Sequence, residues 1–322
     1  SDGGFGSGFS PESTVGSTAD VVMAIIAAGG DPASFAQDGN TPLTYLAAQA
    51  SSTSNSGDLS KLIMAAVAAG ENPREFGGVD SVAKLEGTIG AEGRIGTGDD
   101  TFVSHLLAVL ALRSVGRPIP EAAITYIEGA QQENGGWAWD GSAETAADTN
   151  TTAFAVQALA AAGQPGDSGA IAGAMDYYAA IQNEDGGWPY QNPSEFGTDT
   201  DANSTALTIQ AILAAGQDVA GWTSEAGQDP VSALESFQNP SGAFAWQAAM
   251  PDDNLLATVQ ALPALAGKTL PLATMEVGAA AAAEAPPVTV PETGGPALGM
   301  ALPLALSGLA VAAGGFALRR RQ

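Results

Sequence analysis

The sequence predicts an all-α protein in which about six helical hairpins repeat along the chain. Six alanine-rich apolar segments each end at a glycine, and successive glycines lie 41, 46, 47, 53 and 51 residues apart. A polar, glycine-containing loop precedes each apolar segment, and most of these loops follow another helical stretch. A period of this length is typical of repeat architectures in which each unit packs on its neighbours. The six glycines are Gly29, Gly70, Gly116, Gly163, Gly216 and Gly267.

The six apolar segments are predicted to form the inner layer of these hairpins. Their apolar residues lie on nearly all sides of the helix, as expected where neighbouring helices bury most of its surface. Alanine allows helices to approach closely, and a terminal glycine fits the left-handed position that ends a helix. The segments cover residues 17–30, 58–70, 99–116, 149–163, 203–216 and 253–267.

The helical stretches before the loops are predicted to form an outer layer. The clearest are 121–132 and 170–182, which mix polar and apolar positions as a half-exposed helix does. Packing the two kinds of helix together gives a double layer of hairpins. The pattern leaves open whether this layer closes into a ring or remains an open solenoid.

Composition limits the function classes. The chain has 322 residues, and its 35 acidic residues against 10 Lys and Arg give a net charge of −25. Such a surface repels phosphate backbones and argues against nucleic-acid binding, while it suits cationic partners or divalent ions. The absence of cysteine excludes disulfides, thiolate zinc sites and cysteine nucleophiles, and the single histidine, His105, excludes a multi-histidine metal site.

Three loops share a motif of glutamine, glycine and an aromatic residue. The residues are Gln131, Gly135, Trp137, Gln182, Gly186, Trp188, Gln238, Gly242 and Phe244, the last replacing tryptophan. This Gln-x3-Gly-x-Trp pattern resembles the repeat of the prenyltransferase and squalene oxidase family. Over residues 1–268 the resemblance implies a terpene cyclase-like α/α toroid, in which the Gln and Trp residues tie successive outer helices together.

The segment Gly3-Gly4-Phe5 resembles a first copy of the same loop. Its outer helix would then lie upstream of Ser1. We therefore expect a ring of six units in which the first is truncated.

Acidic and hydroxyl residues stand before the inner helices, which should all start at the same end of the repeat. Asp, Ser and Thr cap helix starts, so capping is one interpretation of these residues. The other is an acidic mouth that attracts a cationic ligand or a divalent cation such as calcium, with no other cofactor expected. The candidate binding residues of this acidic mouth are Asp148, Asp199, Asp252 and Asp253.

Two loops resemble the D-x-D-D-T motif, whose middle acid protonates an alkene in squalene–hopene cyclases. Residues 97–101 read Thr-Gly-Asp-Asp-Thr and lack the first acid, while residues 199–202 read Asp-Thr-Asp-Ala and lack the last. Phe and Trp are also sparse in the inner segments, where carbocations need aromatic faces. The candidate catalytic residues are Asp99, Asp100 and Asp201, whereas His105 is predicted to be a core residue.

The incomplete motifs favour a non-catalytic toroid that binds a hydrophobic or cationic small ligand. A terpene cyclase-like enzyme acting through Asp99 or Asp201 and a purely structural spacer are the alternatives. Protein prenyltransferases and thioester domains need cysteine and are excluded. Cobalamin carriers also use this toroid, but they have no short signature to test in the sequence.

The chain end differs from the repeats. Residues 269–289 are predicted to be an Ala/Pro/Thr-rich linker, and residues 297–318 contain no charge over a length that can span a bilayer. With the arginines that follow, the region 290–322 resembles a sortase sorting signal. The motif residues are Val290, Pro291, Glu292, Thr293 and Gly294.

This resemblance implies cleavage between Thr293 and Gly294 by a sortase-type transpeptidase, after insertion of the 297–318 helix into the membrane. By the positive-inside rule the arginine tail stays in the cytoplasm, so the acidic body is expected at the cell surface. A plain C-terminal membrane anchor and an exosortase-type signal are the alternatives, and both give the same topology.

Overall fold

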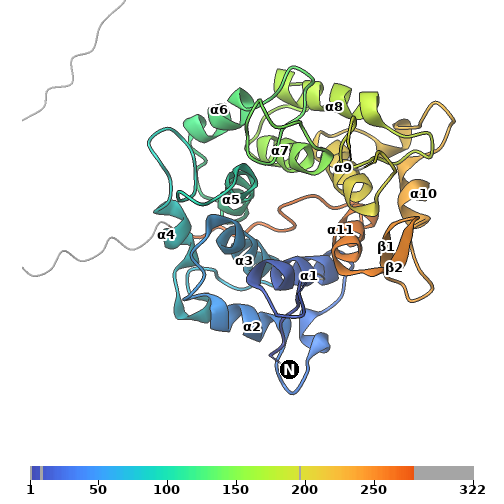
Figure 1. Cartoon of the computed structure of the whole chain (residues 1–322). Coiled ribbons are helices and arrows are strands. Elements are labelled where there is room, and N and C mark those ends of the chain that lie inside the picture. The colour runs from blue at the N-terminus through green and yellow to red at the C-terminus, as the bar shows by residue number, and fades with distance from the viewer. Residues whose placement is uncertain (1, 8–9, 196, 279–322) are drawn as a thin grey trace, which may run out of the picture. The chain divides into compact units, whose positions relative to one another are not determined.

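The computed structural model describes residues 2–7, 10–195 and 197–278. Six of its helices form an inner ring (Figure 1). Each inner helix packs against the next in chain order, and the last also packs against the first, so the ring is closed. The inner helices are α1 (Val15–Ala27), α3 (Ser56–Ala68), α5 (Phe102–Ser114), α7 (Thr149–Ala161), α9 (Ala202–Ala214) and α11 (Leu255–Leu265).

Five outer helices alternate with the inner ones along the described chain and lie on the outside of the ring (Figure 1). Three 3-10 helices, η1 (Pro32–Phe35), η2 (Phe76–Gly78) and η3 (Val219–Gly221), complete the connections. The outer helices are α2 (Pro42–Gln49), α4 (Ser81–Glu86), α6 (Glu121–Gly129), α8 (Gly169–Ile181) and α10 (Pro230–Glu235).

The fold is mostly helical rather than all-α, because the third motif copy forms a hairpin. Strands β1 (Phe244–Gln247) and β2 (Met250–Asn254) pair antiparallel, with Phe244 opposite Asn254. In two other copies the corresponding pairing is a single bridge, Phe5 with Thr14 and Trp137 with Asp148. The hairpin is therefore an extension of a backbone pairing that belongs to the repeat.

The predicted glycine stops all end inner helices. Their φ angles lie between 64° and 91°, the left-handed region in which a side chain is strained. At the end of α7, for example, the amide after Gly163 belongs to Gln164 and donates to the Leu159 carbonyl oxygen at 3.0 Å. The glycine thus lets the chain turn outward while a free helix carbonyl is satisfied.

The glutamines join successive units as the resemblance implies. The Nε2 of Gln131 donates to the Gly135 oxygen in its own loop and to the Ala170 oxygen in α8, both at 2.8 Å. The tryptophans do not join successive units through their indole nitrogens. Each indole nitrogen instead donates a hydrogen bond to the outer helix that precedes it in the same unit. Trp137 Nε1 donates to the Ile127 oxygen of α6 at 2.7 Å, and Trp188 makes the same bond to α8.

The chain after α11 packs on the ring as far as it is described. The Leu270 amide donates to Gln157 Oε1 at 2.8 Å, and the Met275 amide donates to the Ser114 oxygen at 2.7 Å. Within the described ranges no helix is long and apolar enough to cross a membrane. The rest of the predicted linker, the sorting motif 290–294 and the predicted span 297–318 lie outside the described residues.

Candidate functional site

Each inner helix starts with a side-chain cap. In every case the cap oxygen accepts the amide hydrogen of the residue three positions on, which satisfies one free donor of the first turn. Asp148 and Asp201 are two of these caps, whereas the other four are uncharged. The caps are Thr14, Asn55, Thr101, Asp148, Asp201 and Asn254.

A second repeated hydrogen bond holds each loop against its inner helix. The amide of the residue at the aromatic position of the motif donates to the side chain four residues after the cap, at 2.9 to 3.0 Å. Threonine is the acceptor in four units and histidine in the fifth. The pairs are Phe5 with Thr18, Ile95 with His105, Trp137 with Thr152, Trp188 with Thr205, and Phe244 with Thr258.

This bond explains His105, which is a core residue as expected. Its Nδ1 accepts from the Ile95 amide at 2.9 Å, so the ring proton sits on Nε2, 3.2 Å from the Ala123 oxygen. Burial lowers the pKa of His105 to about 4. The imidazole is therefore neutral at physiological pH and has both nitrogens occupied.

Two residues after the motif aromatic, three copies carry a second aromatic residue. These are Trp139, Tyr190 and Trp246, and the corresponding residue of the first copy is Ser7. Trp139 is 50% and Tyr190 43% exposed, in contrast to the buried Trp137 and Trp188. This second aromatic position is not part of the Gln-x3-Gly-x-Trp motif, but an alignment of the three loops shows it.

Ser7, Tyr190 and Trp246 come together in a pocket at the start of α9 and α11, called here the mouth pocket. Its volume is about 490 Å³. Its wall combines aromatic, apolar, amide and carboxyl groups, and none of the described lining residues is Lys, Arg or His. The described lining residues are Ser7, Asn150, Tyr190, Asp201, Asn203, Trp246, Met250, Asn254 and Leu256.

The carboxyl groups of Asp148 and Asp201 both lie close enough to Tyr190 to affect its hydroxyl. Both side chains are almost fully buried, and burial raises the pKa of each to about 6 against the opposing effect of their capping bonds. The backbone places Tyr190 beside the start of α7, because the Thr149 amide donates to its carbonyl oxygen at 2.8 Å. Burial, together with the two carboxylates, raises the pKa of the Tyr190 hydroxyl to about 12.

Hydrogen bonding at the two acids is unequal. Asp201 uses both oxygens, accepting from the Ser204 amide at 2.7 Å and the Ser204 hydroxyl at 3.0 Å. Asp148 accepts from the Thr151 amide through Oδ1 at 2.7 Å. Its Oδ2 is buried, and the nearby Tyr190 hydroxyl acts on the Asp148 carboxyl as a hydrogen-bond donor that lowers its pKa.

The other predicted acids lie elsewhere. Asp100 accepts from the Ser56 amide of α3 and from the Thr97 amide; burial acts to raise its pKa, but these bonds outweigh it and the pKa is lowered. Asp253, on the exposed strand β2, accepts from Asn239 and Ser241. The side chains of Asp99, Asp199, Asp252 and Asp253 are exposed.

The structure thus brings Asp148 and Asp201 together around Tyr190. It keeps Asp99 and Asp100 apart from them, at the start of α5. Across the described residues, no group of three or more His, Cys, Asp or Glu side chains is arranged to hold a metal ion.

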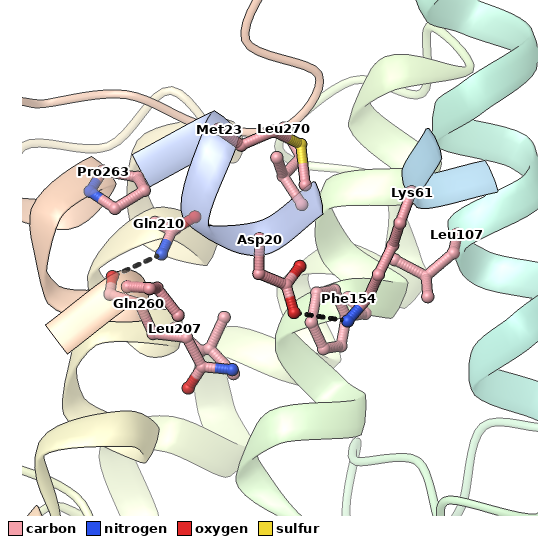
Figure 2. Close-up of a pocket in the computed structure, with 11 residues that line it drawn as sticks. Asp20, Met23, Lys61, Leu107, Phe154, Leu207, Gln210, Gln260, Pro263 and Leu270 are labelled. Atoms are coloured by element: carbon pink, nitrogen blue, oxygen red, sulfur yellow. Dashed lines mark hydrogen bonds and ion pairs between the residues drawn. The ribbon is translucent and has the colours of Figure 1, made fainter. Parts of the chain in front are cut away.

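A second cavity lies inside the ring and is called here the central cavity (Figure 2). All six inner helices and Leu270 line it, yet its volume is only about 50 Å³. Phe154 is the one aromatic residue among the described residues that line it. A space of this size accommodates roughly three or four water molecules.

The polar groups of the central cavity are paired with one another. Asp20 Oδ2 lies 2.6 Å from Lys61 Nζ, and Gln210 Nε2 donates to the backbone carbonyl oxygen of Gln260 at 3.2 Å (Figure 2). Burial raises the pKa of Asp20, while Lys61 opposes this shift. Asn203, which lines the mouth pocket, bonds the Gln260 side chain at 2.9 Å and so connects the two walls.

Residues 99–251 match the family model of the squalene-hopene cyclase C-terminal domain. The ring is a prenyltransferase and squalene oxidase-like α/α toroid. No curated protein matches the sequence of the toroid. Several solved structures share the fold of the toroid at 20% sequence identity or less.

Among them, ent-copalyl diphosphate synthase from Streptomyces platensis has a TM-score of 0.55 at 19% identity, covering 79% of this chain and 50% of that one. The type II terpene cyclase MstE from Scytonema has a TM-score of 0.56 at 15% sequence identity, and the match covers 78% of this chain and 86% of that one. Haptocorrin in complex with Cbi has a TM-score of 0.52 at 20% sequence identity, and the match covers 82% of this chain and 65% of that one. The toroid therefore spans half the length of the first of these proteins, and the likeness concerns the fold.

Proposed function

We propose that this protein is a non-catalytic toroid that binds a small hydrophobic or cationic ligand in the mouth pocket. The observation that carries the proposal is the difference in size between the two cavities, about 490 Å³ at the mouth against about 50 Å³ inside the ring. A ligand of drug or metabolite size is comparable in volume to the mouth pocket and much larger than the central cavity. The haptocorrin structure with Cbi supports the use of this fold in a binding protein.

The chemistry of the cavities also supports binding over cyclisation. Carbocation intermediates need an enclosed space walled by aromatic faces. Among the described residues that line the central cavity, one is aromatic, and the polar groups there pair with one another. Asp99, the middle acid of one incomplete cyclase motif, is exposed to solvent, and its neighbour Asp100 accepts from the Ser56 amide of α3.

Binding can be tested with the neutral fluorescent probe Nile red on the full chain. Trp246→Ala should weaken binding about tenfold, because it removes a wall of the mouth pocket. Trp139→Ala is the matched control, since it removes an exposed aromatic residue at the equivalent position of another copy that does not line the pocket, and affinity should stay within twofold. Equal affinities for the wild type and both variants would contradict the proposed site.

A cyclase-like enzyme is the second candidate, because Asp201 is a buried acid at the pocket with a pKa of about 6. Incubation of the full chain with squalene or geranylgeranyl diphosphate, followed by gas chromatography and mass spectrometry, tests it. We expect no cyclised product. A product that disappears in Asp201→Asn would replace the binding proposal with the enzyme.

From residues 290–322 we also propose that the toroid is anchored at the cell surface through a membrane helix processed by a sortase-type transpeptidase. The uncharged span and the arginine tail support this. Cell-wall and membrane fractions of expressing cells should contain the protein, and Thr293→Ala should shift it from the wall to the membrane. Wall attachment that is unchanged in this variant would contradict the sorting signal.

A further inference from the structure

We infer that the mouth pocket selects an organic ammonium ion that carries N–H donors and an apolar substituent. This inference rests on the proposed function, since it assigns the ligand class of the same pocket. Three independent properties of the wall support it: its charge, a hydrogen-bonding group left unpaired, and its aromatic and apolar surface.

The charge of the wall is negative and uncompensated. Asp201 lines the pocket, Asp148 also acts on the Tyr190 hydroxyl, and no basic residue is among the described lining residues. The central cavity gives the contrast, because there Asp20 is paired with Lys61 at 2.6 Å. Buried carboxylates without a cationic partner are unfavourable, and a bound cation would relieve this cost.

The unpaired polar atom of the pocket lining is an acceptor. Asn150, which lines the pocket, has a buried Oδ1 with no hydrogen-bond partner among the described residues. Buried polar atoms without partners are uncommon in folded proteins. An unpaired acceptor calls for a donor, which a protonated amine supplies and which a carboxylate, an ether or a quaternary ammonium does not.

The apolar part of the wall fits the substituent of such an amine. Tyr190 and Trp246 come from equivalent positions of neighbouring repeats, and aromatic faces attract organic cations at roughly 0.5 to 2 kcal/mol each. Met250 is 53% and Leu256 38% exposed, although both are large apolar residues. Apolar side chains left in solvent around a hollow are typical of a binding site.

The test is calorimetric titration of the full chain with three probes that share one carbon chain: n-hexylammonium, n-hexanol and hexanoate. Hexylammonium should bind at least tenfold more tightly than hexanol, and hexanoate more weakly still. Asp201→Asn should reduce the affinity for hexylammonium about tenfold and leave that for hexanol within twofold. Asparagine also caps helices well, so the variant should keep its fold, which a thermal melt verifies.

The outcomes separate the two levels of the proposal. If hexanol binds as tightly as hexylammonium and both are lost in Trp246→Ala, the pocket binds ligands but the ammonium inference is wrong. If hexylammonium binds and Asp201→Asn leaves its affinity unchanged, the inference is also wrong. If none of the three probes binds, or if Trp246→Ala leaves all binding unchanged, the pocket does not bind amines and the proposed site fails with it.

Discussion

The central cavity and the mouth pocket are both lined by inner helices, yet they differ in how their charges are satisfied. Inside the ring, Asp20 and Lys61 pair with each other and the glutamines bond among themselves. At the mouth, Asp148 and Asp201 act on Tyr190 without a basic residue among the described lining residues, and the Asn150 acceptor remains unpaired. A closed ring of alanine-rich helices thus pairs the charges of its interior and leaves uncompensated carboxyl groups at the mouth.

The largest expected effect concerns the charge pair of the central cavity. Lys61→Met should lower the free energy of unfolding by about 3 kcal/mol, because it leaves the Asp20 carboxylate without its partner. The double variant Lys61→Met/Asp20→Asn should regain much of this loss, since no charge then remains. Urea denaturation measures both. A double variant as unstable as the sum of the singles would mean that the pair is not the source of the effect.

The next effect concerns the acids of the mouth. Because the folded-state pKa of Asp201 is raised from 3.8 to about 6, the folded state holds a proton that the unfolded state has lost between these values. The contribution of Asp201 to stability is therefore greatest at low pH and falls by about 2 to 3 kcal/mol as pH rises from about 4 to 7. In Asp201→Asn this contribution should vanish, which denaturation at pH 5 and pH 7.5 checks. A pH dependence identical to that of the wild type would contradict the raised pKa.

A smaller effect should appear in ligand binding. A cation favours the ionised carboxyl groups, so the affinity for hexylammonium should rise about tenfold from pH 5 to pH 7.5 as Asp148 and Asp201 lose their protons. The affinity for hexanol should stay constant over the same range. Equal pH profiles for the two probes would show that the carboxyl groups do not face the ligand.

The smallest effect is expected at Trp139. Although it occupies the same repeat position as Tyr190 and Trp246, it is half exposed and outside the mouth pocket. Trp139→Ala should change the free energy of unfolding by less than about 0.5 kcal/mol. A change above about 1 kcal/mol would place this side chain in a packing role instead.

The sequence by itself determined the repeat. The six apolar segments, the glycines that end them and the Gln131 and Gln182 bonds between units follow from local composition and spacing, because helix stops and motif contacts act within one unit or between neighbours. The position of His105 in the core was also predictable from its apolar surroundings. The hairpin formed by β1 and β2 was not predictable. Two other copies of the motif make a single backbone bridge at this place, and only the copy at Phe244 extends it into paired strands.

Tertiary structure decided everything that depends on contacts across the ring. Asp99 and Asp201 both precede an inner helix, yet one is exposed and the other buried, because Thr101 caps α5 while Asp201 itself caps α9. The closing contact between α1 and α11 brings Ser7 beside Trp246, and these residues are far apart in sequence. The shape of the mouth pocket therefore arises only when the last unit meets the first, whereas the raised pKa values of Asp148 and Asp201 arise where two consecutive units meet at Tyr190.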